Sequence, residues 1–477
     1  MSMMKKSMRS LILLSCSSAL LFSLGGCTAG KDYEAPAINA PQQFVSQDVI
    51  AALNIGKSEA AAETLWWEGF DDTLLNSLIE SGLERNFSIA AATARIREAE
   101  ARVTLAGASF KPSVSAGGSS NLQERRALSQ NRESTTTTSA GADLNIAIPL
   151  DISGRNRREI EAAMAGLEAA RADLNGAILG ISADIAAEYL TLRGNQRQLE
   201  LLRESVALQE QTLSIVRSRY EAGLSPELDF RRAETSVENL RADIPALEQA
   251  LQNSRNRIAT LSGDFPGARE EELRSASAIP SYQLEIPDIL PMDVLRARPD
   301  IQRAEAQFKQ AIANIGVAEA AYYPDFRLSG TLGLSATGVS SLPVAHTLIA
   351  SLAALITQVI ADGGARDANL EIAEARAQEA LANYEQTLRE ASEDVERSLA
   401  ALNASQERQA ALERSLNASR RSFSQAETLY QQGLISFLDV VDAQRSLANT
   451  EQQLARERTN TLVQIARLFE SLGTQIR

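Results

Sequence analysis

Residues 220–229 read YEAGLSPELD, and 210 positions later residues 430–439 read YQQGLISFLD. One offset aligns the tyrosine, the glycine, two leucines and the aspartate of these segments, and an alanine beyond each of them. Gly154 and Gly364 lie the same distance apart. Self-similarity at a fixed spacing is typical of a duplicated architecture. The chain is therefore predicted to contain two copies of one structural unit of about 200 residues.

The composition favours long helices and disfavours several functions. Only 5% of the 477 residues are aromatic, and the net charge is −14 at pH 7. Long alanine-, leucine- and glutamate-rich stretches are typical of packed helices, and an acidic chain is a poor nucleic-acid binder. The single histidine, His346, is expected to be structural or solvated. No cofactor, metal site or catalytic group is predicted.

The N-terminus has the charge order of a secretory signal, predicted over residues 1–26. Three basic residues precede an apolar run at 11–24, which is too short for a convincing membrane span. The residues before Cys27 read LGG and resemble the bacterial lipobox, which implies lipidation of Cys27. Thr28 next to it then implies sorting to the outer membrane. The alternative is an ordinary signal followed by a coincidental cysteine.

Composition shifts divide the rest of the chain. A proline-containing, aperiodic stretch is predicted to be a tether, and a proline-rich stretch between the two repeats a linker. The predicted segments are the tether at 27–64, the first repeat at 65–263 with a β-hairpin at about 112–150 and a helical hairpin at about 155–262, the linker at 264–298, the second repeat at 299–472 with a β-hairpin at about 324–361 and a helical hairpin at about 365–472, and the tail at 473–477.

Alternating residues predict strands in both repeats. Apolar and polar side chains alternate over 143–150, after a Ser/Thr-rich stretch at 119–140, and again over 326–335. A period of two residues indicates a strand with one apolar face. Each repeat is expected to insert a β-hairpin of about ten residues per strand, the length that crosses a bilayer when tilted.

A helical period follows each predicted hairpin. From Ile160 to Tyr220, positions taken in steps of four and three are apolar at 14 of 18 places. This predicts a coiled-coil face on a rod of ~100 Å. Gly223 is expected to end the rod, with Ser225 as the next N-cap and Pro226 as the first helical residue. The return helix is shorter than the rod, so a helix beginning near 86 is expected to complete the wall.

Four membrane-length strands cannot close a barrel, because spanning barrels begin at about eight strands and open edges are prohibitive in lipid. The chain is therefore expected to pool its strands with those of other copies. A dimer would supply eight strands and a trimer twelve. The predicted fold class is mainly α with a membrane β-barrel, built from a duplicated repeat that has two long-helix walls and a β-hairpin.

The sequence resembles the TolC-like outer-membrane efflux channels, in the NodT-like lipoprotein branch found in tripartite RND systems. The resemblance covers nearly all of the mature chain and rests on the lipobox and several short motifs. These are Trp66-Trp67 with Phe70, Arg298-Pro299-Asp300-Ile301 followed by Ala304-Glu305, Tyr323-Pro324, Asp362-Gly363-Gly364, and both Tyr-x-x-Gly-Leu turns. Val359-Ile360 departs from the pattern, because many relatives carry proline and a large apolar residue there.

The resemblance implies a homotrimer with a 12-stranded β-barrel in the outer membrane of a Gram-negative bacterium and a 12-helix periplasmic α-barrel. It implies a periplasmic adaptor and an inner-membrane RND-type transporter as partners. The expected function is a passive exit duct for small toxic compounds. Two alternatives remain, the exit duct of a protein secretion system and a periplasmic coiled-coil scaffold lipoprotein. An enzyme is the least expected class, since no histidine pair, nucleophile elbow or phosphate loop is present.

The functional residues are expected at the helical turns, at the ends of the rods far from the strands. Asp439 and Asp442 lie on one helix face, and the resemblance places them at the pore constriction, where rings of carboxylates favour cations. Asp229 and Tyr430 occupy the facing turns, and a hydrogen bond or its charge network between the paired helices is hypothesised to help hold the mouth shut. Helix-start carboxylates and a seam-ending tyrosine are the structural alternatives. The exposed turn residues expected to dock the adaptor are Gly223, Leu224, Ser225, Gly433, Leu434 and Ser436.

Overall fold

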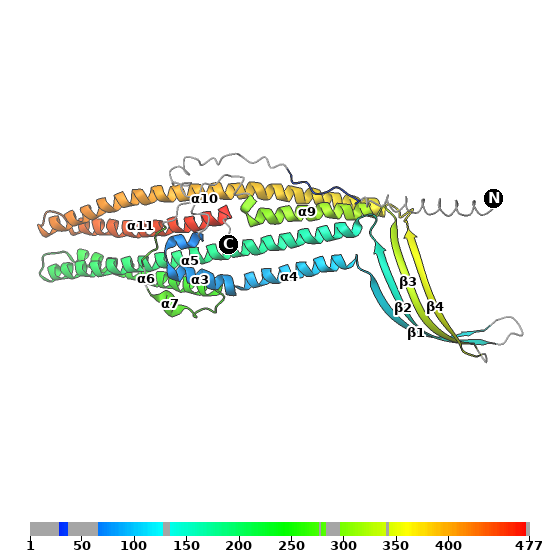
Figure 1. Cartoon of the computed structure of the whole chain (residues 1–477). Coiled ribbons are helices and arrows are strands. Elements are labelled where there is room, and N and C mark those ends of the chain that lie inside the picture. Colours follow the sequence, from blue (N-terminus) through cyan, green and yellow to red (C-terminus); the bar gives the residue numbers. More distant parts are fainter. Residues whose placement is uncertain are drawn as a thin grey trace. The chain divides into compact units, whose positions relative to one another are not determined.

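The computed structural model describes residues 28–36, 65–126, 134–275, 278–282, 296–339 and 343–473. The predicted signal peptide, Cys27, most of the tether and part of the linker lie outside these ranges. Within them the chain is mostly helical and carries one four-stranded sheet (Figure 1). No helix of this part of the chain is both long enough and apolar enough to cross a membrane.

The order of elements repeats along the chain. A helix of 22 residues leads into a β-hairpin, a 67-residue helix and a shorter return helix, and this run occurs twice. The first run is α4 (Phe87–Ala108), β1 (Ser113–Arg125), β2 (Thr135–Leu150), α5 (Arg155–Glu221) and α6 (Glu227–Leu261). The second is α9 (Pro299–Ala320), β3 (Asp325–Val339), β4 (Ala345–Thr357), α10 (Ala365–Gln431) and α11 (Phe437–Leu472). Three short elements lie outside the runs, η2 (Trp66–Phe70), α3 (Thr73–Arg85) and α7 (Glu270–Arg274).

The chain forms two compact units. The first, called here the sheet unit, comprises Met1–Pro36, Ile96–Ala170 and Ala304–Tyr384. The second, the helical unit, comprises Ala37–Arg95, Arg171–Arg303 and Glu385–Arg477.

The sheet of the sheet unit is antiparallel in the order β1-β2-β3-β4. Its strands have 13, 16, 15 and 13 residues, so the expectation of about ten was too short. Of the Ser/Thr-rich stretch expected before the strand, residues 119–125 and 135–140 belong to the two strands themselves. Serine and threonine are consecutive from Thr135 to Ser139 and so occupy both faces of the strand, and the stretch therefore lacks a strong hydrophobic period.

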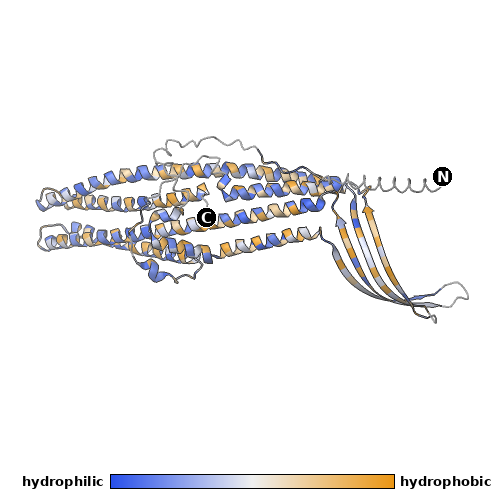
Figure 2. Cartoon of the chain, viewed as in Figure 1, coloured by the Kyte–Doolittle hydropathy of each residue, from blue (hydrophilic) through white to orange (hydrophobic). Residues whose placement is uncertain are grey.

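The strand register keeps residues of equal parity on one face. One row across the sheet is Ala116, Leu144, Leu332 and Ala350, and the next row is Ser115, Asn145, Thr331 and Ser351. Even-numbered positions therefore form one largely apolar face, and odd-numbered positions a largely polar one. Figure 2 shows the resulting mixture of apolar and polar residues along the strands. Ile349 and Leu355 of β4 are apolar exceptions on the odd face.

The helical unit has a core in which η2 and α3 pack on the long helices. Trp66 and Phe70 of η2 are 5% and 1% exposed. The Trp66 ring stacks on Phe469 of α11 at 5.5 Å between centroids. The core also includes Ile185 and Tyr189 of α5, Ile258 of α6 and Val395 of α10. The tryptophan motif is thus a packing element that ties the two helical hairpins together.

Two further contacts fix α11 in the helical unit. The buried Arg298, which precedes α9, donates to the Ser471 carbonyl at 2.6 Å and pairs with Asp300 and Asp394. In α5, Gly194 allows close approach, because a Cβ there would lie 2.2 Å from the Thr459 hydroxyl oxygen. The Thr459 side chain of α11 therefore packs directly against the backbone of α5 at Gly194.

The predicted apolar face of α5 is buried in only part of its length. Leu192, Leu202 and Val216 are 0%, 1% and 1% exposed, whereas Met164 is 51% exposed. Around Met164 the buried positions are Ala162, Ala165 and Ala169 instead. A straight helix has 3.6 residues per turn, so a 3.5-residue stripe moves around it over many turns. Within a single chain the predicted stripe is therefore exposed at its start.

Candidate functional site at the helical turns

The two helical turns have the same backbone geometry. Gly223 and Gly433 both have φ of +73°. The Gly223 amide donates to the Tyr220 carbonyl and the Leu224 amide to that of Arg219, at 2.9 and 2.8 Å. The second turn repeats both bonds at 2.9 Å, from Gly433 and Leu434. This pattern closes a helix with a left-handed glycine, which lacks the Cβ penalty of other residues.

The return helices begin differently in the two turns. Helix α11 begins at Phe437 after Ser436, whose amide and hydroxyl both donate to the Asp439 carboxylate, at 2.9 and 2.7 Å. Helix α6 begins at Glu227, and Pro226 occupies the N-cap position with extended backbone. The expectation of Ser225 as N-cap and Pro226 as first helical residue was one position early. Ser225 instead donates to Asp229 at 3.4 Å.

The Asp439 carboxylate is held in its ionised form. Hydrogen bonds from the Ser436 side chain and backbone lower its pKa below the ordinary aspartate value. Asp439 and Asp442 are both exposed at the start of α11, one turn apart, while Asp229 is half-buried. The second turn thus presents two carboxylates to its surroundings.

A small apolar cluster lies just behind the turns and joins the two helical hairpins. Val216 of α5, Ala233 of α6 and Phe437 of α11 are its buried members. Tyr430 of α10 packs against it, together with Leu213, Phe230 and Val441. Contacts between the two hairpins at this end of the helical unit therefore depend on a few side chains.

Tyr430 contacts the first hairpin through Arg219. The Arg219 guanidinium lies 5.2 Å from the centre of the Tyr430 ring, within cation–π range. In the described part of the chain no hydrogen bond joins Tyr430 to Asp229. Tyr220, the counterpart of Tyr430, stacks instead on Phe230 of its own hairpin at 5.6 Å.

Arg219 was not singled out from the sequence, although a comparison of the two duplicated turns could have found it. The duplicated turns differ at this position, because the residue equivalent to Arg219 in the second turn is Leu429. A basic residue in one copy and a leucine in the other indicates that the two turns contact different surroundings. The turn tips are exposed, with Leu224 and Leu434 at 70% and 67%.

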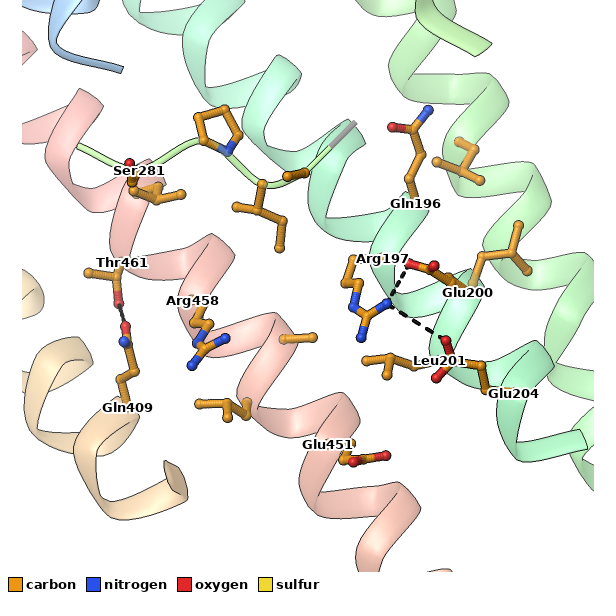
Figure 3. A pocket seen from close by; sticks show the side chains of 18 of the residues that line it. Gln196, Arg197, Glu200, Leu201, Glu204, Ser281, Gln409, Glu451, Arg458 and Thr461 are labelled. Atoms are coloured by element: carbon orange, nitrogen blue, oxygen red, sulfur yellow. Dashed lines mark hydrogen bonds and ion pairs between the residues drawn. The ribbon is translucent and has the colours of Figure 1, made fainter. Parts of the chain in front are cut away.

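A groove of about 1760 Å³ lies within the helical unit, lined by α5, α6, α7, α10, α11 and residues 278–282 (Figure 3). Leucines and ion pairs line it, including Arg197 with Glu200 at 2.5 Å and Arg458 with Glu413 at 3.0 Å. Its described lining residues include no histidine or cysteine. The described residues also hold no cluster of three His, Cys, Asp or Glu side chains able to bind a metal.

Comparison with known proteins identifies the family. The model of the outer membrane efflux protein family matches residues 78–264 and 290–474. The chain belongs to the outer membrane efflux protein family. The two matched segments correspond to the two copies of the repeated run of elements.

Named relatives and a solved structure agree with the family. The chain is 32% identical to nodulation protein T of Rhizobium leguminosarum bv. trifolii, over 91% of each chain. It is 28% identical to the probable outer membrane lipoprotein SilC of Salmonella typhimurium, over 96% of this chain and 97% of SilC. The structure of the outer-membrane channel OprN superposes with a TM-score of 0.86 at 31% identity, covering 94% and 99%.

The family establishes the function in outline. The protein is the outer membrane channel component of an efflux pump. Members of the family act with an adaptor and an inner-membrane pump, and they are channels rather than enzymes.

Proposed function

We propose that three copies of the chain assemble into one duct, with a 12-stranded β-barrel in the outer membrane and a 12-helix α-barrel in the periplasm. The observation that carries this proposal is the register of the sheet, which gives four strands one continuous apolar face. Within the described sheet, β1 and β4 each have one neighbouring strand only. Lipid offers no partner for their outer backbone groups, so pairing β4 of one copy with β1 of the next satisfies them.

The scaffold alternative is disfavoured by the same sheet. Leu332, Leu348 and Leu352 on the even face are 52%, 70% and 77% exposed in the single chain. A water-facing scaffold has no use for such a face, whereas lipid covers it favourably. The protein-secretion alternative has no observation in its favour, and the family is one of efflux proteins. An inner-membrane RND-type transporter is the proposed source of the exported compounds.

The assembly is tested on detergent-purified protein. Native mass spectrometry is expected to give the mass of three chains, and the same material is expected to form stable conducting events in planar bilayers. A strand-edge variant supplies the control, because Ile349→Pro in β4 removes a backbone donor without removing the helices. Monomeric wild-type protein without conductance would contradict the proposal.

Asp439 and Asp442 are proposed to select cations at the periplasmic mouth. In three copies the two exposed carboxylates form two stacked rings of negative charge, which attract cations and repel anions. Because hydrogen bonds from Ser436 lower the pKa of Asp439, this ring stays charged at lower pH than a free aspartate would. The positions at helix starts are also favourable to the helix dipole, which does not conflict with a pore role.

Neutralising these rings should reduce selectivity. In planar bilayers at low salt, Asp439→Asn with Asp442→Asn is expected to lower the cation-to-anion permeability ratio by roughly two- to tenfold. Glu407→Gln with Glu427→Gln removes an equal charge, two carboxylates, from exposed positions of α10 and serves as the control. Ser436→Ala should raise the pKa of Asp439, so that selectivity is lost at a higher pH as the solution is acidified. An unchanged ratio in the double variant would rule out this role.

The mouth is proposed to be held shut partly by Tyr430, with Asp229 ordering the facing turn. The contact of Tyr430 with Arg219 supports this role, because it links the two hairpins through a ring and a cation rather than through the tyrosine hydroxyl. Such contacts contribute ~0.5–2 kcal/mol, enough to shift a gating equilibrium without fixing it.

Two tyrosine variants separate the ring from the hydroxyl. Tyr430→Leu and Arg219→Ala are each expected to increase the mean single-channel conductance, whereas Tyr430→Phe keeps the ring and should behave as wild type. Arg217→Ala is the matched control, since Arg217 lies 5.5 Å from Phe230 of its own hairpin. If Tyr430→Phe opens the channel as Tyr430→Leu does, a hydroxyl bond such as that to Asp229 is the gate instead. Wild-type conductance in both Tyr430→Leu and Arg219→Ala would exclude Tyr430 from gating.

The adaptor is proposed to dock on the turn tips, formed by Gly223, Leu224 and Ser225 and by Gly433, Leu434 and Ser436. The two leucines project from rigid helix ends, which makes them suitable apolar anchors.

Charged tips should uncouple the channel from its pump. Leu224→Asp with Leu434→Asp is expected to abolish efflux-dependent resistance in cells, because an unpaired carboxylate opposes burial in an apolar contact. Conductance and outer-membrane level should stay at wild-type values. Leu228→Asp makes the same change at a leucine that is 58% exposed but outside the turn. Full resistance in the double variant would place docking elsewhere.

A further inference from the structure

The described N-terminal segment, residues 28–36, lies on the sheet unit. Ala29 is 5% exposed, and its amide donates to the Ser153 carbonyl at 2.9 Å. The Thr28 hydroxyl accepts a hydrogen bond from Arg157 at 2.9 Å. Ser153 lies between the end of β2 and the start of α5. The chain just after Cys27 is therefore attached at the junction of strand and helix.

Arg158 is the centre of this attachment. It is 3% exposed, and its guanidinium donates to the Ala29 carbonyl at 3.0 Å and to the Gly30 carbonyl at 2.9 Å. It also binds the Asp32 and Glu161 carboxylates at 2.8 and 2.7 Å. Burial opposes its charge, but the hydrogen bonds to Glu161 and Asp32 outweigh burial and raise the pKa of Arg158. A buried arginine thus has all three nitrogens committed, mainly to this segment.

Three glycines leave the space that the segment and Arg158 occupy. A Cβ on Gly30, which has φ of +83°, would lie 2.6 Å from the Gly316 Cα. A Cβ on Gly154, with φ of +78°, would lie 2.8 Å from the Thr28 Cα, and one on Gly316 would lie 2.8 Å from Arg158. Contacts this short do not occur with real Cβ atoms, so only glycine fits at these positions.

Tyr33 closes the far end of the attachment. Its hydroxyl donates to Glu305 of α9 at 2.9 Å, and its ring packs edge-on against Phe308 at 5.8 Å. Lys309 lies 5.4 Å from the ring centre. Residues from two helices, α5 and α9, therefore hold the segment at both of its ends.

We propose that this site is an intramolecular dock for residues 28–33, which fixes the acylated Cys27 beside the end of β2, with Arg158 as the positioning residue. The proposal rests on the lipidation of Cys27 that the resemblance to the lipobox implies. Adjacent Cα atoms are 3.8 Å apart, so a docked Thr28 holds Cys27 at the same junction. Leu150, the last residue of β2, belongs to the apolar face. The docked segment, unlike a free tether, thereby places the acyl chains of Cys27 in the same leaflet as the apolar face of the sheet.

Trypsin tests the dock in the full-length, detergent-purified protein. Lys31 is exposed, so the Lys31–Asp32 bond lies within the docked segment and is cleaved only when the segment detaches. Arg158→Gln is expected to be cleaved at this bond at least tenfold faster than wild type. Each rate is expressed relative to that of the same bond in the urea-unfolded protein. Arg155→Gln is the matched control, because Arg155 is exposed and pairs with Glu159. Equal cleavage rates in Arg158→Gln and Arg155→Gln would overturn the dock.

A second variant distinguishes detachment of the segment from unfolding of the whole protein. Tyr33→Leu changes the segment and leaves the body intact, and it should also speed cleavage at Lys31 while all other tryptic sites keep wild-type rates. Protection in Tyr33→Leu equal to that of wild type would show that the segment is not held as proposed.

The peptide that trypsin releases distinguishes a failure of lipidation from a failure of the dock. Mass spectrometry of residues 27–31 reports acylation directly, whatever the cleavage rate. An unmodified wild-type peptide would refute the lipidation, whereas Cys27→Ser protein should keep the protection of Lys31. The positioning role is read by pulse–chase assembly, in which Arg158→Gln should form trimers several-fold more slowly than Arg155→Gln. Acylated Arg158→Gln protein that assembles at the control rate would overturn that role.

Discussion

Backbone hydrogen bonding at the edges of one sheet constrains the whole protein. Strands β1 and β4 lie at the two ends of the strand order, and their outer N–H and C=O groups need partners that hydrocarbon cannot provide. The register adds an apolar face that water covers unfavourably. A sheet with these two properties is stable in a membrane only after its edges meet further strands. The proposed assembly is thus a consequence of the sheet rather than an addition to it.

The duplication sets the architecture, and its departures from symmetry indicate function. Gly223 and Gly433 close their helices with the same torsion angle and the same two hydrogen bonds. The residues around them diverge, since Arg219 faces Tyr430 while Tyr220 remains on its own hairpin. Pro226 caps one return helix, and Ser436 with Asp439 caps the other. Positions at which the two repeats differ are therefore those at which one repeat makes a contact that the other repeat does not make.

Buried charge serves attachment in both units. Arg298 binds the carbonyl at the end of α11 in the helical unit, and Arg158 binds the N-terminal segment in the sheet unit. In each case an arginine joins carbonyl and carboxylate oxygens from distant parts of the chain. The planar guanidinium provides several donors in fixed directions, which lysine cannot reproduce. Removing either side chain would leave carbonyl groups unpaired where water is excluded.

The sequence by itself determined the repeat, the order of strands and long helices, the two glycine turns and the family resemblance, because these depend on local periodicity and on φ angles that only glycine adopts readily. It placed one return helix a residue early, and the stripe that it predicted on α5 is exposed at Met164 in the single chain, because capping and helix drift depend on neighbours. Only the tertiary structure decided that Tyr430 contacts Arg219 and that Arg158 holds residues 29–32. Both contacts join residues far apart in sequence or in separate hairpins, and no local pattern encodes which partner a side chain meets after packing.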